Sequence, residues 1–125
     1  MQTENTKAFL EKYRVLEFEK AVLEQILRKE WNDKVQCRLE ELKAQIEIID
    51  LCLSILNTDE IFVIKNRSFS KMKRDAITDL YEKTFGIEYT KSERTLKLIH
   101  ANALKKITVL VNETNTNKYI IRMLS

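Results

Sequence analysis

The chain has 125 residues, of which 44% are hydrophobic and 33% charged, with a single glycine and no proline. This composition supports a packed core, and it excludes Gly-rich phosphate-binding loops and most turn-dense all-β folds. Residues 1–60 carry 9 Lys/Arg against 13 Asp/Glu, whereas residues 61–125 carry 13 against 6. A basic half joined to an acidic half is typical of a nucleic-acid-binding module with a protein-facing appendage, although ordinary solvated surfaces also vary in charge.

Several functional classes are not expected from the residue inventory. The apolar runs are too short to span a membrane, and the N-terminus lacks the layout of a signal peptide. The two cysteines, Cys37 and Cys52, and the single histidine, His100, are too few for a structural zinc site, so we expect reduced thiols and no metal or cofactor. No nucleophile–base arrangement is evident, and we do not expect an enzyme.

Two apolar stripes mark the first half of the chain. The first runs from Phe9 to Leu27 and is interrupted at Lys20. The second steps by four and three residues without a polar member, as expected of a coiled-coil-like helix. It consists of Val35, Leu39, Leu42, Ile46, Ile49, Leu53 and Leu56.

The segment between the stripes allows two arrangements. Asn32 or Asp33 can cap a new helix, which gives an antiparallel helical hairpin. Alternatively, Leu27, Trp31 and Val35 continue the seam through a stutter and predict one long helix. We favour the hairpin, because a single helix of more than about 50 residues is rare in so small a protein. The second stripe is longer than one hairpin partner covers, so it predicts a homodimer through residues 9–56.

The next two helices are predicted from their ends. Residues 57–60 have the spacing of a capping box, with Asn57 or Thr58 as the cap and Glu60 reaching back. They predict a short helix to about residue 65, broken at residues 68–70. A second helix is expected from about Lys71 to Phe85. Gly86 follows it as a C-terminal cap, because glycine adopts positive φ without steric cost.

A last long helix is predicted from Thr90 as cap, with Glu93 completing a capping box, to about Asn112. Its apolar face includes His100, which we therefore expect to be a partly buried packing residue rather than a ligand or catalyst. A polar linker at 113–117 and apolar residues between 119 and 124 predict a docking segment.

A helix, a glycine turn and a capped helix with a basic outward face have the layout of a helix-turn-helix. An arginine on that face can pair with guanine, hydroxyls and lysines can meet phosphates, and small apolar side chains can meet thymine methyls. The predicted DNA-binding residues are Lys91, Ser92, Arg94, Thr95, Lys97, Leu98, Ala101, Asn102 and Lys105.

The run Ser92-Glu93-Arg94-Thr95, followed by Ala103-Leu104-Lys105-Lys106-Ile107, resembles the end of a sigma-region-4-like helix-turn-helix. The leucine-rich segment 39–56, the acidic cap at 57–60 and the apolar residues 61–64 resemble, in that order, phage transcriptional regulators of the ArpU/RinA type. The resemblance covers most of the chain to about residue 111. The resemblance implies a sequence-specific regulator of phage or prophage late genes in the bacterial cytoplasm. It implies that the protein binds double-stranded DNA, with host RNA polymerase or another phage regulator as possible protein partners. The turn from 85 to 91 is longer than in a compact helix-turn-helix.

The predicted architecture is all-α. Residues 1–57 are expected to form a coiled-coil-like hairpin or long helix for dimerisation, residues 58–112 a helix-turn-helix-like DNA-binding domain, and residues 113–125 a linker and apolar tail. The alternative function is a small phage or mobile-element protein that binds another regulator through its helical surface without binding DNA.

Overall fold

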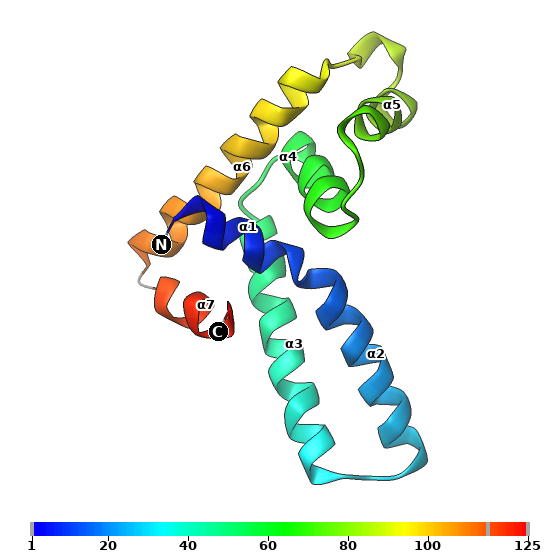
Figure 1. Ribbon diagram of the computed structural model, residues 1–125, viewed down its shortest axis with the longest axis vertical. Coiled ribbons are helices and arrows are strands. Elements are labelled where there is room, and N and C mark those ends of the chain that lie inside the picture. The colour runs from blue at the N-terminus through cyan, green and yellow to red at the C-terminus, as the bar shows by residue number, and fades with distance from the viewer. Residues whose placement is uncertain (1, 115, 125) are drawn as a thin grey trace.

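The computed structural model describes residues 2–114 and 116–124, and over these ranges the fold is all-α, as predicted (Figure 1). Two short non-α turns, π-helix η1 and 3₁₀ helix η2, interrupt the α-helices. In chain order the elements are α1 (Thr3–Glu11), α2 (Tyr13–Lys29), α3 (Asp33–Leu53), α4 (Thr58–Val63), η1 (Ile64–Phe69), α5 (Arg74–Phe85), η2 (Ile87–Tyr89), α6 (Glu93–Glu113) and α7 (Asn117–Leu124).

Helices α2 and α3 form an antiparallel hairpin that projects from the rest of the molecule (Figure 1). The hairpin prediction is confirmed, and the single long helix is excluded, because the chain reverses at 30–32. Oδ1 of Asn32 caps α3 by accepting from the backbone N–H groups of Lys34 and Val35, at 2.9 and 3.2 Å. The Arg38–Glu19 ion pair, with a closest N–O distance of 3.1 Å, joins the two helices across the hairpin.

The predicted dimer seam lies inside the chain's own core, so its assignment as a homodimer interface is corrected. Leu42 and Ile49 are fully buried, and Val35, near the hairpin tip, is half-buried. One hairpin partner is too short to cover the whole seam, but other elements of the same chain cover the rest. In the fold α2 covers the tip end of α3, and side chains from α1, η1 and α6 cover its other end. The remaining seam residues are also buried, namely Leu39, Ile46, Leu53 and Leu56.

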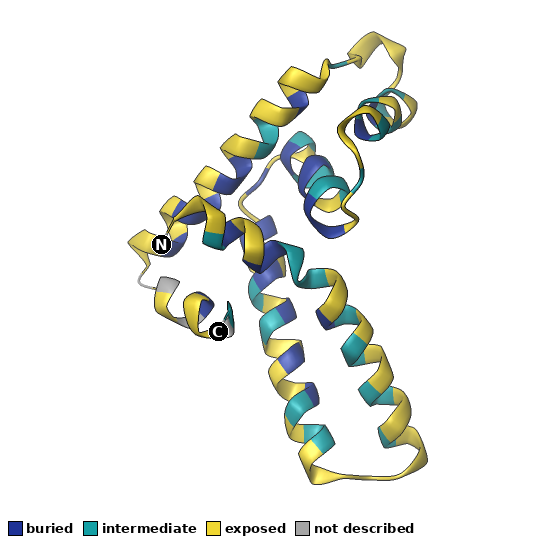
Figure 2. Cartoon of the chain, in the orientation of Figure 1, coloured by how far each residue is buried: buried dark blue, intermediate teal, exposed yellow. Residues whose placement is uncertain are grey.

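One hydrophobic cluster joins the three segments predicted from the sequence (Figure 2). It takes Phe9 and Leu10 from α1, Ile107 from α6 and Ile120 from α7, together with the seam of α3. The apolar C-terminal segment therefore packs within the chain, with α7 against α1. The predicted tail residues Tyr119 and Met123 have side chains outside the described part.

The segment between α4 and α5 differs from its prediction. The capping box of α4 is confirmed, because Asn57 and Glu60 exchange hydrogen bonds of 2.9 and 3.0 Å. The helix does not end near residue 65 but continues directly as the π-helix η1 to Phe69, so the break falls at Ser70, within the predicted 68–70. Lys71 then adopts a φ of 54°, and α5 begins at Arg74 rather than near Lys71. The wider π turn changes the direction of the side chains that follow. Phe69 stacks on Tyr13 with ring centroids 4.3 Å apart.

The long helix α6 takes its place from contacts with α1, α4 and α5. Buried hydroxyls of Thr6 and Thr108 hydrogen-bond between α1 and α6. A second, smaller apolar cluster holds the start of α6 against α4 and α5. Gly86, at a φ of 102°, caps α5 as predicted, and its N–H donates to the Glu82 carbonyl at 2.8 Å. The smaller cluster contains Val63, Ile77, Tyr81 and Leu96.

Candidate nucleic-acid interface

The cap of helix α6 lies two residues later than predicted, at Ser92 instead of Thr90. Oγ of Ser92 accepts from the Thr95 backbone N–H at 3.2 Å and so caps the helix. Thr90 was predicted as the cap, but its hydroxyl donates to the Ile87 carbonyl at 2.7 Å and closes the η2 turn instead. The predicted capping box at Thr90 and Glu93 is therefore wrong. The Ser92 hydroxyl, expected to meet a phosphate, is used within the helix cap.

The predicted DNA-binding residues are exposed with one exception. Lys91 is half-buried, and its Nζ lies 5.7 Å from the centroid of the Tyr81 ring, which places the ammonium over the aromatic face. This contact ties the start of α6 to α5. The exposed members are Ser92, Arg94, Thr95, Lys97, Leu98, Ala101, Asn102 and Lys105.

These residues do not form one patch, because they spread around α6. Lys97 and Ala101 line a cavity on one side of the helix. Asn102 and Lys105 line an open groove on the other side. Neither the cavity nor the groove is lined by Arg94 or by Leu98, which is 60% exposed. These two residues lie one helical turn apart. The two sides must therefore be considered separately.

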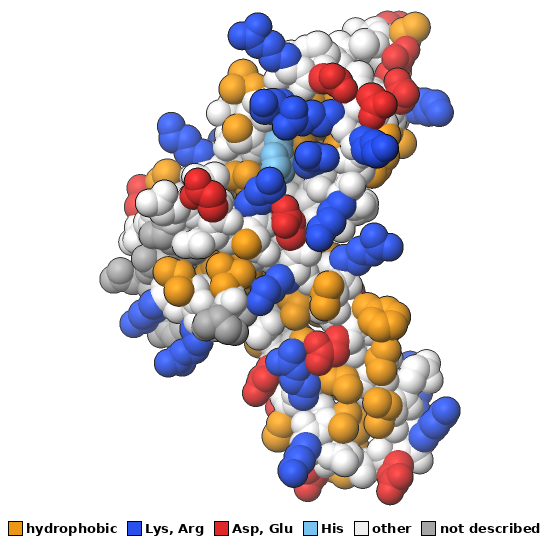
Figure 3. Space-filling model, viewed as in Figure 1, with side chains coloured by type: hydrophobic (Ala, Val, Ile, Leu, Met, Phe, Trp, Pro, Cys, Tyr) orange, Lys and Arg blue, Asp and Glu red, His pale blue; other side chains and the backbone are white. Residues whose placement is uncertain are grey.

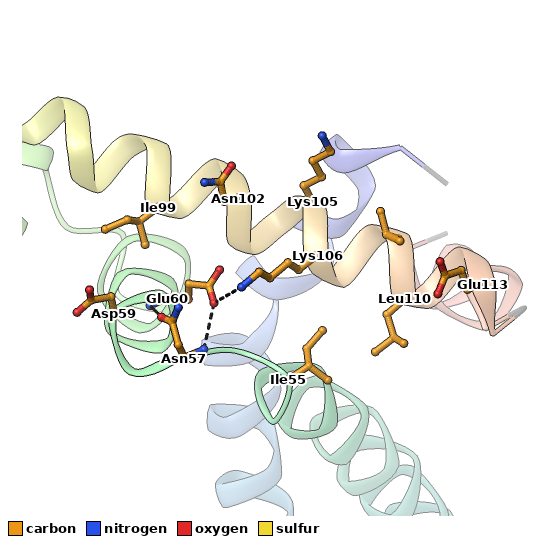
Figure 4. A pocket seen from close by; sticks show the side chains of 11 residues that line it. Ile55, Asn57, Asp59, Glu60, Ile99, Asn102, Lys105, Lys106, Leu110 and Glu113 are labelled. Carbon is orange, nitrogen blue, oxygen red and sulfur yellow. Dashed lines mark hydrogen bonds and ion pairs between the residues drawn. The ribbon is translucent and has the colours of Figure 1, made fainter.

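The groove side carries carboxylates (Figure 4). The groove has a volume of about 700 Å³ and lies between α6 and the α3–α4 connection. Nζ of Lys106 is 2.9 Å from Oε1 of Glu60, whose side chain is only 5% exposed. Asp59 accepts a hydrogen bond of 2.7 Å from the Tyr81 hydroxyl. Burial, with this hydrogen bond, raises the pKa of Tyr81 to about 12. With Glu113 also in the lining, this side is unfavourable for phosphate.

The cavity side is basic. A cavity of about 250 Å³ opens beside His100. Its lining includes Lys7 of α1, Arg67 of η1, Arg74 of α5 and Lys97 of α6. We call these four side chains the basic cluster. Figure 3 shows blue Lys and Arg side chains gathered around the pale blue histidine.

The charges of the basic cluster are not neutralised by the protein. Glu93 is the single carboxylate in the cavity lining, and in the described part of the chain none of the four cations forms an ion pair. Arg67 is oriented by the backbone, because its Nη1 donates to the Met72 carbonyl at 2.7 Å. The cluster is therefore a concentration of four positive charges beside one carboxylate, and no ion pair neutralises them among the described residues.

His100 lies half-buried at this cavity, as the sequence predicts. Its Nε2 is 3.1 Å from the hydroxyl of Ser68, a residue that is 1% exposed. Burial and, to a smaller extent, the charges of Lys7, Arg67 and Arg74 together lower the pKa of His100 to about 4. The imidazole is consequently neutral at pH 7.

Because of His100, we expect the free energy of unfolding to depend on pH in the acid range. Between about pH 6.5 and pH 4, an unfolded histidine binds a proton and the folded His100 does not. The unfolded state then holds more protons, so the free energy of unfolding should fall as the pH drops through this window. His100→Gln, which keeps a polar partner for Ser68, should show a shallower fall. Urea denaturation at several pH values measures both profiles, and parallel profiles would contradict the assignment.

Sequence reasoning missed Lys7, Arg67 and Arg74. The excess of Lys/Arg in residues 61–125 was the available signal for the two arginines. Lys7 gave no such signal, because it belongs to the acidic half and reaches the cavity only when α1 packs against α6.

In the described ranges no helix is long and apolar enough to cross a membrane. The chain matches no family model, no curated protein and no solved structure.

Proposed function

We propose that the protein binds double-stranded DNA with the exposed first turns of α6 and the basic cluster beside them. One observation carries the proposal, namely that four cations from four separate elements converge on one side of α6 without an ion pair among the described residues. Duplex DNA carries one negative charge per about 1.7 Å of its axis and attracts such a surface strongly.

The arrangement of α5 and α6 supports a helix-turn-helix mode of binding. The start of α6 packs on α5 through Leu96 and the ring of Tyr81, while Arg94 and Leu98 stay exposed. Arg94 can reach a guanine edge in the major groove, and Lys97 with the basic cluster can hold the backbone. Residues 92–107 resemble a sigma-region-4-like helix-turn-helix, and residues 39–64 resemble phage regulators of the ArpU/RinA type. These resemblances extend the proposal to transcriptional regulation of phage or prophage genes.

A contrast of three single variants tests this function on a duplex selected from a random-sequence pool. Arg94→Ala should cost roughly 1–3 kcal/mol on the selected site and relax the preference at one base pair. Lys97→Ala should weaken binding to every sequence alike and lower the salt slope by about one. The sequence predicted that Lys105 contacts DNA, but it lies on the carboxylate-lined side of α6. We therefore revise that prediction and use Lys105→Ala as the matched control, which should have the smallest effect. Fluorescence anisotropy at several salt concentrations measures all three.

Two results would contradict the proposal. If no duplex is enriched from the pool at low salt, the protein does not bind DNA. If Arg94→Ala and Lys97→Ala lose affinity uniformly on all sequences, binding is electrostatic without sequence specificity.

A second candidate function is binding to another protein without DNA. It is favoured by an exposed apolar stripe along α2, which consists of Val15, Phe18, Val22 and Ile26 at 65, 72, 40 and 43% exposure. Their spacing of three and four residues places them on one helix face, and contiguous apolar surface of this kind is typical of protein contacts. Failure of the DNA selection would favour this candidate.

A further inference from the structure

We propose that the cavity beside His100 is a phosphate-binding pocket that receives one phosphate group of the DNA backbone. The proposal rests on the proposed DNA-binding function, because it names the ligand group of that same surface. The cavity is small, about 250 Å³, and is bounded by α1, the end of α4, η1, α5 and α6. It is therefore a local receptor for one anionic group rather than a broad charged face.

The side chains around the cavity have the chemistry that a phosphate requires. Arg67 and Arg74 each present a planar fork of N–H donors that matches phosphate oxygens, and Lys7 and Lys97 add compact charges. Glu93 is the one acidic member of the lining and lies at the first position of α6. A bound phosphate would relieve the repulsion among four cations that have no ion-pair partner among the described residues.

The fold holds part of the pocket in place before any ligand arrives. The guanidinium of Arg67 is bonded to the Met72 carbonyl, at the point where Lys71 adopts positive φ and closes the π-helical segment. Ser68 of the same segment is buried against His100. Groups fixed in this way lose less conformational entropy on binding.

His100 reports directly on the occupancy of the pocket. The neighbouring cations Lys7, Arg67 and Arg74 help to keep its pKa low. Of the remaining charged groups in the cavity lining, Lys97 opposes protonation and Glu93 favours it. A bound phosphate adds negative charge beside the imidazole and should raise its pKa. Because the chain contains one histidine, its ring proton signal is unambiguous in an NMR spectrum.

The test follows the His100 ring signal of the full chain with inorganic phosphate as the probe and chloride at equal ionic strength as the screening control. At neutral pH, phosphate should shift the signal saturably and chloride should not. The pKa of His100 should rise by about one unit or more in phosphate. Arg74→Gln should weaken phosphate binding by about tenfold or more. Lys83→Gln removes an equal charge from an exposed lysine of α5 that does not line the pocket, and it should leave phosphate binding unchanged. Circular dichroism confirms that each variant is folded.

A second measurement separates the pocket from the DNA-binding function. Arg74→Gln should weaken duplex binding about tenfold or more and lower its salt slope by about one. If duplex binds but phosphate leaves the His100 signal unchanged and Arg74→Gln binds DNA like the parent, the pocket proposal is overturned and DNA binding stands. If phosphate binds and duplex does not, the pocket takes a free phosphate compound and the backbone assignment is overturned. Equal shifts with phosphate and chloride indicate screening alone and also overturn the proposal.

Discussion

Ile46→Asp is expected to unfold the protein. Ile46 is 6% exposed and belongs to the cluster that joins α3 to the rest of the core. Loss of a buried Ile side chain costs roughly 2–5 kcal/mol, and a carboxylate left in an apolar site adds a desolvation cost of several more. The sum approaches the whole stability of an ordinary domain, about 5–15 kcal/mol. Far-UV circular dichroism and urea denaturation measure the loss.

Leu51→Asp is the matched control for this variant. Leu51 lies on the same helix, α3, but is 64% exposed, so the new carboxylate stays in water. It should change the free energy of unfolding by roughly 0.5 kcal/mol or less. If Ile46→Asp stayed folded and only dissociated a dimer, the seam at residues 35–56 would lie between two chains and would not be covered within one chain.

Lys106→Met is expected to destabilise the fold by about 1–3 kcal/mol, the cost of leaving a buried charged group without its partner. Glu60 is almost wholly buried, and its Oε1 accepts from both Lys106 Nζ and the Asn57 N–H (Figure 4). Methionine keeps most of the lysine stem but removes the ammonium, so the carboxylate keeps only the bond within its helix cap. Thermal and urea denaturation measure the loss.

A double-mutant cycle separates the ion pair from general effects of substitution. Glu60→Gln preserves an acceptor for Asn57 without a charge, and the double variant Glu60→Gln/Lys106→Met should lose less than the two single losses added. Lys105→Met is the adjacent control, because Lys105 is exposed and forms no ion pair among the described residues. Strict additivity in the cycle would show that Lys106 and Glu60 do not interact energetically.

Local features were predictable from the sequence where a short-range pattern has one physical solution. Asn32 at the start of α3, the Asn57–Glu60 capping box and Gly86 at the end of α5 all occur as predicted. Each depends on hydrogen bonds or dihedral angles within a few residues. The exposed and buried faces of α6 were predictable for the same reason, since a helix repeats every 3.6 residues.

Predictions failed where two neighbouring residues offered the same local chemistry. Thr90 and Ser92 both qualify as caps, and the choice was decided when the Thr90 hydroxyl closed the η2 turn. The continuation of α4 into η1 was also not predicted, and its last residue, Phe69, stacks on Tyr13 of the distant helix α2. Local propensity does not contain such contacts.

By itself, the sequence determined that this protein is all-helical, where α3 and α4 begin, where α5 ends, and which face of the long helices is apolar. It did not determine what covers those faces. Tertiary packing decided that the α3 seam is occupied within one chain, and that Lys7 from the acidic half joins Arg67, Arg74 and Lys97 around His100. The reason is physical: hydrophobic burial is non-directional, so an apolar stripe specifies that it will be covered but not by which partner. The candidate site is a product of that choice, since its charges meet only after the helices have packed.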